Sequence, residues 1–245
     1  MENIQKMQYI SKRPKLVFIH GAGEVSDVWY YQSKNFVCSD AVSLPGHPQG
    51  EVCSSIEEYA AWLDNYIRER NYNDVVLVGH SAGGAVILTC ALKSPKNYKG
   101  LVLIGAGAKF RPLYETIAIS KRAIRGDDLE WRRSFVEKYR LVDPKMREVL
   151  IEKRVSLGPS VQLNDLICCS RFDVRGMLSE IKIPSLIICG RDDIQTPPEY
   201  SHYLATNIKY SELVIIEGAT HQVMLETPTQ VNKAIEGFVT KIAKV

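Results

Sequence analysis

One serine of this sequence stands in a pattern that supports nucleophilic chemistry. Ser81 lies in the segment Gly79-His80-Ser81-Ala82-Gly83, between the apolar run Val75 to Gly79 and a segment of helical composition. A G-x-S-x-G pattern between a strand and a helix is typical of a serine held on a sharp turn. Side chains at Gly79 or Gly83 would collide with the neighbouring strand or helix, so small residues are required there. The pattern also occurs by chance in glycine-rich loops, and Ser81 therefore needs partners elsewhere in the chain.

Two segments later in the chain supply the histidine and the carboxylate that such a serine needs. A serine hydroxyl is a poor nucleophile until an imidazole takes its proton, and a carboxylate must orient that imidazole. His221 follows the apolar run Leu213 to Glu217, and Asp193 follows the run Ser185 to Gly190. The carboxyl ends of parallel strands meet at one edge of a sheet, where ligands bind in open α/β folds. The sequence therefore offers His221, and Asp193 or its neighbour Asp192, as candidate partners of Ser81.

The motifs around these residues resemble those of the α/β-hydrolase superfamily, in its cap-bearing carboxylesterase-like branch. In the family's order, and over nearly the whole chain, they are His20-Gly21-Ala22-Gly23, Leu44-Pro45-Gly46-His47, the serine turn, Gly190 to Pro197 and Gly218 to His221. The resemblance implies that the backbone N–H groups of Ala22 and Ala82 form an oxyanion hole. It also places the catalytic histidine at His221, and the acid three residues after a glycine and four before a proline, which selects Asp193 over Asp192. The resemblance thus implies a catalytic triad of Ser81, Asp193 and His221. Just before the Leu44-Pro45-Gly46-His47 motif, this sequence has Ser43 where the family often has an aspartate.

Short β-branched runs alternate with amphipathic segments along the chain, which indicates an α/β fold with a mostly parallel sheet flanked by helices. We expect six or seven strands, because only a short segment precedes the first core strand. Ser54 and Glu57 have capping-box spacing at the start of one predicted helix. The predicted strands are Leu16 to His20, Cys38 to Leu44, Val75 to Gly79, Leu101 to Gly105, Ser185 to Gly190 and Leu213 to Glu217, and the predicted helices are Ser54 to Arg70, Ala82 to Leu92 and Thr227 to Ile242.

Residues 108–171 interrupt this alternation, because they contain helical patterns but no convincing strand. We predict a helical cap, or lid, inserted into an α/β-hydrolase core domain formed by residues 1–107 and 172–245. Two helices are expected around Leu113 to Arg125 and Asp128 to Arg140, a third begins at Asp143 with Pro144 in its first turn, and a fourth follows Pro159. The apolar residues expected to turn inward are Met146, Val149 and Leu150 in the third helix, and Leu163, Leu166 and Ile167 in the fourth.

The predicted cap contributes aromatic and basic side chains that bear on the choice of substrate. Trp131, Phe135 and Tyr139 share one helix face, and such a stripe more often packs inside the cap than against a ligand. Residues 109–171 hold 14 basic and 9 acidic side chains. Such an excess is typical of solvated helix faces, although a basic lid would also attract anionic acyl substrates. The aromatic candidates for substrate binding are Phe110, Tyr114, Trp131, Phe135 and Tyr139, with Phe172 nearby.

The composition argues against several other classes of protein. The 31 basic and 28 acidic residues give a net charge of +3, which indicates neither nucleic acid nor a membrane as a partner. Residues 1–13 lack the apolar core of a signal peptide, and no run reaches the roughly 18 apolar residues of a membrane span, so we expect a cytoplasmic protein.

The six cysteines lack CxxC spacing, which favours reduced thiols. No histidine and carboxylate cluster has metal spacing, so we expect no metal and no cofactor. The histidines outside the triad are expected at structural or exposed positions, and they are His20, His47, His80 and His202.

These observations favour a carboxylic ester hydrolase that cleaves a small or medium acyl substrate, a small-molecule ester, through an acyl-enzyme intermediate. The same triad would serve acyl transfer, lactone or carbon–carbon bond hydrolysis, or cyanohydrin cleavage, all of which occur on folds similar to this one. A non-catalytic ligand-binding receptor on the same fold is a further alternative. The intact candidates for every catalytic role argue against it, because a binding protein does not need an activated nucleophile. The sequence is compatible with a monomer or a homodimer.

Overall fold

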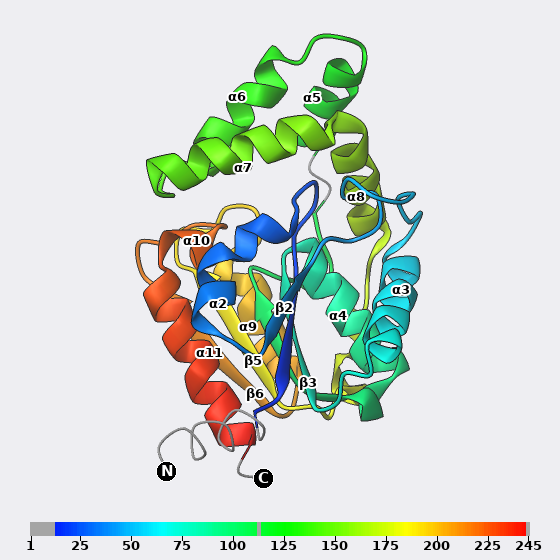
Figure 1. Ribbon diagram of the computed structural model, residues 1–245, viewed down its shortest axis with the longest axis vertical. Coiled ribbons are helices and arrows are strands. Elements are labelled where there is room, and N and C mark those ends of the chain that lie inside the picture. The colour runs from blue at the N-terminus through cyan, green and yellow to red at the C-terminus, as the bar shows by residue number, and fades with distance from the viewer. Residues whose placement is uncertain (1–12, 112–113, 244–245) are drawn as a thin grey trace.

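A six-stranded parallel sheet forms the centre of the structure (Figure 1). The computed structural model describes residues 13–111 and 114–243, so most of the segment that precedes the first strand lies outside the described residues. Neighbouring strands follow the order β2-β1-β3-β4-β5-β6, and every neighbouring pair is parallel. Each predicted run overlaps one of the observed strands, with ends that differ by up to three residues. The observed strands are β1 (Lys15–Ile19), β2 (Ser39–Val42), β3 (Val75–His80), β4 (Tyr98–Ile104), β5 (Ser185–Gly190) and β6 (Ser211–Ile216).

The inner strands are buried on both faces, because nearly all of their side chains are apolar. β3 and β5 are buried along their whole length, whereas the edge strands β2 and β6 are partly exposed. In the register of the sheet, Val78 lies between Phe18 of β1 and Val102 of β4. Continuous apolar runs of this kind suit strands that helices cover on both sides. The parallel register brings the carboxyl ends of β3, β5 and β6, and therefore the three predicted motifs, to one edge of the sheet.

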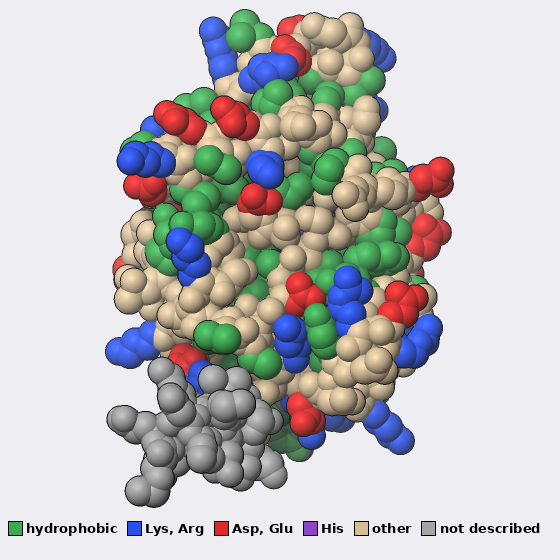
Figure 2. Space-filling view, in the orientation of Figure 1, with side chains coloured by type: hydrophobic (Ala, Val, Ile, Leu, Met, Phe, Trp, Pro, Cys, Tyr) green, Lys and Arg blue, Asp and Glu red, His purple; other side chains and the backbone are tan. Residues whose placement is uncertain are grey.

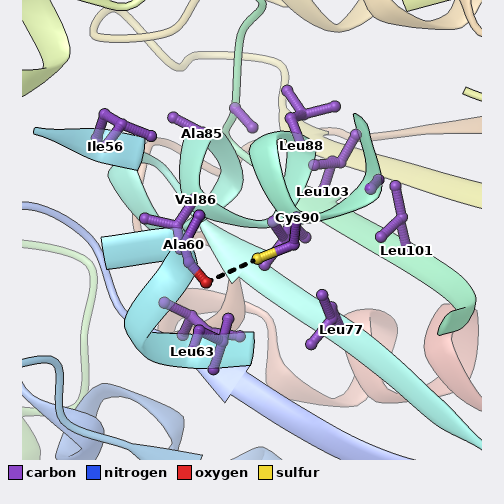
Figure 3. Close-up of a cluster of buried hydrophobic side chains, with 14 of the residues drawn as sticks. Ile56, Ala60, Leu63, Leu77, Ala85, Val86, Leu88, Cys90, Leu101 and Leu103 are labelled. Atoms are coloured by element: carbon purple, nitrogen blue, oxygen red, sulfur yellow. Dashed lines mark hydrogen bonds between the residues drawn. The ribbon is translucent and has the colours of Figure 1, made fainter. Parts of the chain in front are cut away.

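Helices cover both faces of the sheet and bury two apolar clusters. Figure 3 shows part of the first cluster, where Cys90 of α4 faces Ala60 of α3 and its Sγ lies 3.6 Å from the carbonyl oxygen of Ala60. One face carries α3 (Ile56–Glu69), α4 (Ala82–Lys93) and α9 (Pro198–Asn207), and the other carries α2 (Tyr30–Asn35), α10 (Val223–Glu226) and α11 (Pro228–Ile242). Short 3₁₀ helices are η1 (Ser26–Trp29), η2 (Pro95–Asn97) and η3 (Arg175–Glu180).

The start of α3 lies one residue later than the predicted capping box. Ser55, and not Ser54, is the N-cap, and its Oγ accepts a hydrogen bond of 3.2 Å from the N–H of Glu58. The carboxylate of Glu58, and not that of Glu57, reaches back to the N–H and hydroxyl of Ser54, at 2.8 Å each. Both Ser-Glu pairs have the same spacing, so the sequence did not distinguish them. Starting the helix at Ile56 places its apolar stripe on the sheet.

Four helices follow β4 and lie together above the carboxyl edge of the sheet in Figure 1. We call them the helical insert: α5 (Tyr114–Ile124), α6 (Leu129–Lys138), α7 (Pro144–Leu157) and α8 (Pro159–Arg171). All four were predicted, although Leu113, the predicted first residue of α5, lies outside the described residues. Asp143 caps α7 as expected, because its Oδ1 accepts from the N–H groups of Lys145 and Met146 at 3.1 and 3.2 Å.

The insert buries only part of the apolar set that its sequence pattern predicted, and it also buries polar side chains. In α7, Leu150 is buried, but Val149 is 43% exposed and the prediction that it turns inward is wrong. Arg154 is buried instead, at 4% exposure. In α8, Leu166 is buried as predicted, but Leu163 and Ile167 are only half-buried, and Gln162 and Asp165 are buried as well. Patterns of apolar residues miss these positions, because the side chains there contact charged and polar groups of the core.

The turn between β3 and α4 requires glycine for steric reasons. A Cβ on Gly79 would lie 2.4 Å from the carbonyl oxygen of Gly83 in α4. A Cβ on Gly83 would lie 2.4 Å from the carbonyl oxygen of Ile19 and 2.6 Å from that of His20, at the end of β1. Both contacts involve backbone atoms, which cannot rotate away. The predicted collisions are confirmed, and they explain how α4 approaches the sheet so closely.

Gly83→Ala should lower the free energy of unfolding by about 1 to 3 kcal/mol, because the added methyl group must push α4 away from β1. Urea unfolding followed by tryptophan fluorescence measures this change. The matched control is Gly237→Ala in α11, where a Cβ meets no atom within 4 Å. An exposed helical glycine costs about 0.5 to 1 kcal/mol relative to alanine, so this control should be more stable than the wild type. Equal stability of Gly83→Ala and the wild type would contradict the steric argument.

Candidate active site

Ser81 occupies the sharp turn between β3 and α4 in a strained backbone conformation. Its φ is +51° and its ψ is −116°, a region that residues other than glycine rarely adopt. Its N–H donates to the carbonyl oxygen of Ile104, the last residue of β4, at 2.9 Å. Ser81 lines a cavity of about 170 Å³ beneath the helical insert, together with Ala22 and His221. The turn therefore presents the serine, as expected, at the edge where the strands end.

His221 pairs with Asp193 beside the same cavity. The distance from His221 Nδ1 to Asp193 Oδ2 is 2.8 Å, and both residues are buried. Burial alone would raise the pKa of Asp193, but the charge and hydrogen bond of His221 and the hydrogen bonds from Thr196 lower it below its usual value. Asp192 is exposed, and its backbone N–H donates to Ala219 at 2.9 Å. The structure thus brings Asp193, and not Asp192, to the histidine.

The segment after Asp193 locks its carboxylate in one orientation. Oδ1 accepts from the N–H groups of Gln195 and Thr196, at 2.8 and 2.9 Å. The Thr196 hydroxyl lies 2.8 Å from Asp193 Oδ2 and 2.8 Å from the carbonyl oxygen of Gly105. The sequence analysis did not assign this role to Thr196. The Asp-x-x-Thr spacing, which is typical of side-chain turns onto nearby backbone N–H groups, is the signal that would have found it.

Of the two predicted oxyanion residues, Ala82 directly follows Ser81 and Ala22 borders the same cavity as Ser81. Ala22 lines the cavity, and Ala82 is the first residue of α4, where backbone N–H groups have no partner within the helix.

His20 anchors the 20–24 loop, because its Nε2 accepts from the N–H of Leu44 at 3.0 Å. Burial and the nearby His47 lower the pKa of His20 to about 4, which keeps the ring neutral and able to accept. His20 therefore has the structural position that the sequence suggested, and His202 is exposed on α9.

Asp165 extends from α8 of the insert to the same loop. Its Oδ2 accepts from the N–H of Gly23 at 2.7 Å and lies 2.8 Å from Nε2 of His47. Its Oδ1 accepts from the hydroxyl of Tyr59 at 3.0 Å. Burial would lower the pKa of His47, but the hydrogen bond and charge of Asp165 raise it above its usual value. The sequence analysis missed Asp165, because its partners come from three segments more than a hundred residues earlier.

Glu24 is a second buried carboxylate that the sequence analysis missed. Burial would raise its pKa, but the charge of Lys138 and the hydrogen bond of His80, with further charges nearby, hold the pKa well below its usual range. Burial and the charge of Arg154 lower the pKa of Lys138 to about 8. Glu24 Oε1 lies near Lys138 Nζ (3.1 Å), Arg154 Nη1 (3.2 Å), Gln222 Nε2 (3.1 Å) and the Tyr139 hydroxyl (3.3 Å), and Oε2 lies near the Gly21 N–H (3.1 Å) and His80 Nδ1 (3.2 Å).

The five predicted pocket aromatics have different surroundings. Phe110 and Phe135 line the cavity. Trp131 is buried edge-on against Phe135, with ring centroids 4.7 Å apart, and its Nε1 donates to Gln162 at 2.8 Å. Tyr139 is buried and donates to Glu24, whereas Tyr114 is 75% exposed. Of the described lining residues, only the first two belong to the predicted aromatic set.

The described residues also bear on cysteine chemistry, metal binding and membrane spans. All six cysteines are free thiols, as expected. Among residues 13–111 and 114–243, no group of three or more His, Cys, Asp or Glu side chains is placed to hold a metal ion. Within the same ranges, no helix combines the length and the hydropathy that crossing a membrane requires.

Residues 16–234 match the model of the alpha/beta hydrolase family, and the chain belongs to this family. It is 25% identical to an (E)-2-((N-methylformamido)methylene)succinate hydrolase of Acinetobacter baylyi, over 91% of this chain and 89% of that protein. It is also 25% identical to a pimeloyl-[acyl-carrier protein] methyl ester esterase of Wigglesworthia glossinidia brevipalpis, over 92% and 93% of the two chains. The solved structure of a thermophilic esterase superimposes with a TM-score of 0.78 and 29% identity, over 93% and 90%. The predicted family and fold are confirmed.

Glu24→Gln should lower the free energy of unfolding at pH 7 by about 3 to 5 kcal/mol, because the buried Arg154 and the partly buried Lys138 would lose their shared anion. The depressed pKa of Glu24 means that its stabilisation is present above the ordinary pKa of 4.5 and is lost as the pH falls further. The difference between wild type and Glu24→Gln should therefore narrow below pH 4.5. Urea unfolding at pH 7, 5, 4 and 3.5 measures it.

The matched control for this prediction is Glu152→Gln, an exposed glutamate on α7. Its free energy of unfolding should stay within about 0.5 kcal/mol of the wild type. A Glu24→Gln variant as stable as this control at pH 7 would show that the buried carboxylate does not stabilise the neighbouring cations.

Proposed function

We propose that the chain is a serine hydrolase that cleaves carboxylic esters of small or medium acyl groups through an acyl-enzyme intermediate. In this proposal Ser81 is the nucleophile, His221 the base and Asp193 the acid that orients the base. One observation carries the proposal: the buried pair of His221 and Asp193, 2.8 Å apart, adjoins the same cavity as the strained Ser81. The relatives named as a hydrolase and a methyl ester esterase support it.

The first half of the reaction acylates the serine. Ser81 Oγ attacks the carbonyl carbon of the ester while Nε2 of His221 takes the hydroxyl proton. Asp193 accepts from Nδ1–H and stabilises the imidazolium that forms. The bond between the carbonyl carbon and the alcohol oxygen then breaks, and His221 gives its proton to the departing alcohol. The acyl group remains bound to Ser81.

The second half of the reaction releases the acid. His221 takes a proton from a water molecule, whose oxygen attacks the acyl carbon, and returns that proton to Ser81 Oγ as the acyl bond breaks. In both halves the carbonyl oxygen becomes negative, and the N–H groups of Ala22 and Ala82 would donate to it. The N-terminus of α4 adds a favourable dipole at this point. Removing one such donor elsewhere costs about 100- to 1,000-fold in rate, so these two groups are a major part of the proposed mechanism.

We further propose that residues 108–171 act as a cap over a core domain of residues 1–107 and 172–245. The insert supplies most of the cavity wall, which supports this division. A cavity of about 170 Å³ is smaller than the roughly 300 Å³ at which drug-sized pockets begin, and it favours a small acyl group. Phe110 and Phe135 would contact that group. Trp131 and Tyr139 would support this wall from behind, and Tyr114 is assigned no contact.

Ser81→Ala should abolish hydrolysis of p-nitrophenyl acetate, because it removes the proposed nucleophile from the cavity that His221 also lines. The melting temperature should stay within a few degrees of the wild type, which separates loss of chemistry from loss of fold. A fluorophosphonate probe should label the wild type and not the variant. Substantial residual turnover would remove Ser81 from the mechanism, and an unlabelled, folded wild type would favour a ligand-binding protein on this fold.

Asp193→Asn should lower kcat by about 1,000- to 10,000-fold, because an amide in place of the carboxylate holds the wrong imidazole tautomer. The neighbouring carboxylate provides the control. Asp192 is exposed, and Asp192→Asn should keep kcat within about threefold of the wild type. Steady-state rates with p-nitrophenyl butyrate compare the two variants. A larger loss in Asp192→Asn than in Asp193→Asn would reverse the assignment of the acid.

A further inference from the structure

The cavity above Ser81 has an unbalanced charge. Its described lining residues include three cations, Arg111, Lys138 and Arg154, and no carboxylate. On the face of the molecule shown in Figure 2, basic and acidic side chains are interspersed, also over the insert. The one-signed lining is therefore a property of the cavity and does not reflect a uniformly basic surface.

Arg154 is held beside the 20–24 loop with donor capacity to spare. The residue is 4% exposed, its guanidinium carbon lies 4.7 Å from the centre of the Phe135 ring, and Nη1 is 3.2 Å from Glu24 Oε1. Its Nη2 is 3.2 Å from the position that a Cβ on Gly23 would take. Among the described residues, Nε has no hydrogen-bond partner. A guanidinium has five N–H groups, so one carboxylate leaves it able to bind a second anion.

Glu24 cannot compensate both cations of this wall. It carries one negative charge, whereas Lys138 and Arg154 carry two positive charges, and four donors already crowd its Oε1 within 3.3 Å. If these residues served only to attach the insert to the core, one cation would be enough to pair with Glu24. The other nearby carboxylate, Asp193, is occupied by His221 and by the segment that ends at Thr196. The wall, formed by the buried Arg154 and the partly buried Lys138, therefore carries one positive charge more than Glu24 can balance.

We propose that Arg154 and Lys138 form a carboxylate-binding subsite, and that the substrate is a half-ester of a dicarboxylic acid. This inference rests on the proposed function. The guanidinium and the ammonium of the two residues would bind the free carboxylate while Ser81 attacks the ester at the other end of the acyl chain. Gln162 adds a donor, because its Oε1 already accepts from Trp131 and its amide nitrogen is left to donate.

The position of Arg154 assigns the carboxylate to the acyl part of the substrate. A second cavity, of about 220 Å³, adjoins the first and shares Ser134, Lys138, Gln195 and His221 with it. It also borders the 88% exposed Ile194, so it opens to the surface and suits the departing alcohol. Arg154 lines the inner cavity and not the outer one. The acyl chain in the inner cavity is therefore the part that ends at the guanidinium.

The first test compares two esters that differ in one charge. Mono-4-nitrophenyl adipate carries the free carboxylate, and methyl 4-nitrophenyl adipate has it masked. The wild type should prefer the first by about 10- to 100-fold in kcat/KM, as expected for a charge-assisted contact. Arg154→Gln and Lys138→Gln should each reduce this ratio at least fivefold. Lys145→Gln, which removes an exposed charge from the same helix as Arg154, should keep the wild-type ratio.

The second test measures binding without chemistry. Calorimetry with Ser81→Ala should detect binding of succinate, glutarate or adipate dianions, and the double variant Ser81→Ala/Arg154→Gln should lose it. Circular dichroism confirms that each variant is folded. If Arg154→Gln does not fold, Arg154→Lys replaces it and should retain the charge preference but bind at least threefold more weakly, because lysine lacks the planar fork.

The two tests separate the inference from the proposed function. Equal kcat/KM for the two esters, with activity that depends on Ser81 and no binding of any of the three dianions, would overturn the subsite and leave the esterase intact. Dianion binding that depends on Arg154, in a protein that hydrolyses neither ester, would support the subsite and reject the esterase. Dianion binding of undiminished affinity in Ser81→Ala/Arg154→Gln, or in the Arg154→Lys replacement, would also overturn the subsite.

Discussion

The buried carboxylate of Glu24 holds together the segments that build the cavity. It contacts His80 beside Ser81, Gln222 beside His221, and the insert through Lys138 and Arg154. A carboxylate without donors is very costly to bury, and these donors come from separate parts of the chain. The arrangement is therefore stable only when the core strands and the insert are assembled together.

A second carboxylate makes the reciprocal connection. Glu24 belongs to the core and receives donors from the insert, whereas Asp165 belongs to the insert and receives donors from the core. The 20–24 loop lies between them, because Gly21 donates to Glu24 and Gly23 donates to Asp165. The backbone of Ala22, the proposed oxyanion donor, is thus fixed from both sides. Charge–dipole contacts, in addition to apolar packing, set the position of the insert over Ser81.

The core and the insert contribute different parts of the proposed chemistry. Ser81, Asp193 and His221 follow three core strands, and the family match covers this framework. The cations and the aromatic wall come mainly from α6 and α7. A fold of this kind supports many reactions, and the side chains at the site decide which one occurs. The unbalanced charge on the cavity wall is the feature of this chain that bears most directly on the choice of substrate.

The sequence by itself determined the strands, the family and the position of Ser81, because each depends on local rules. Buried β-branched runs predict parallel strands, and glycine is required where α4 meets β1. Predictions from the same rules placed the α3 cap one residue too early and wrongly turned Val149 inward, because these rules use only spacing and apolarity. Only the tertiary structure decided that Glu24, Asp165 and Arg154 are buried. Whether a charged side chain is solvated or buried depends on which groups pack opposite it, and those groups lie far away in the sequence.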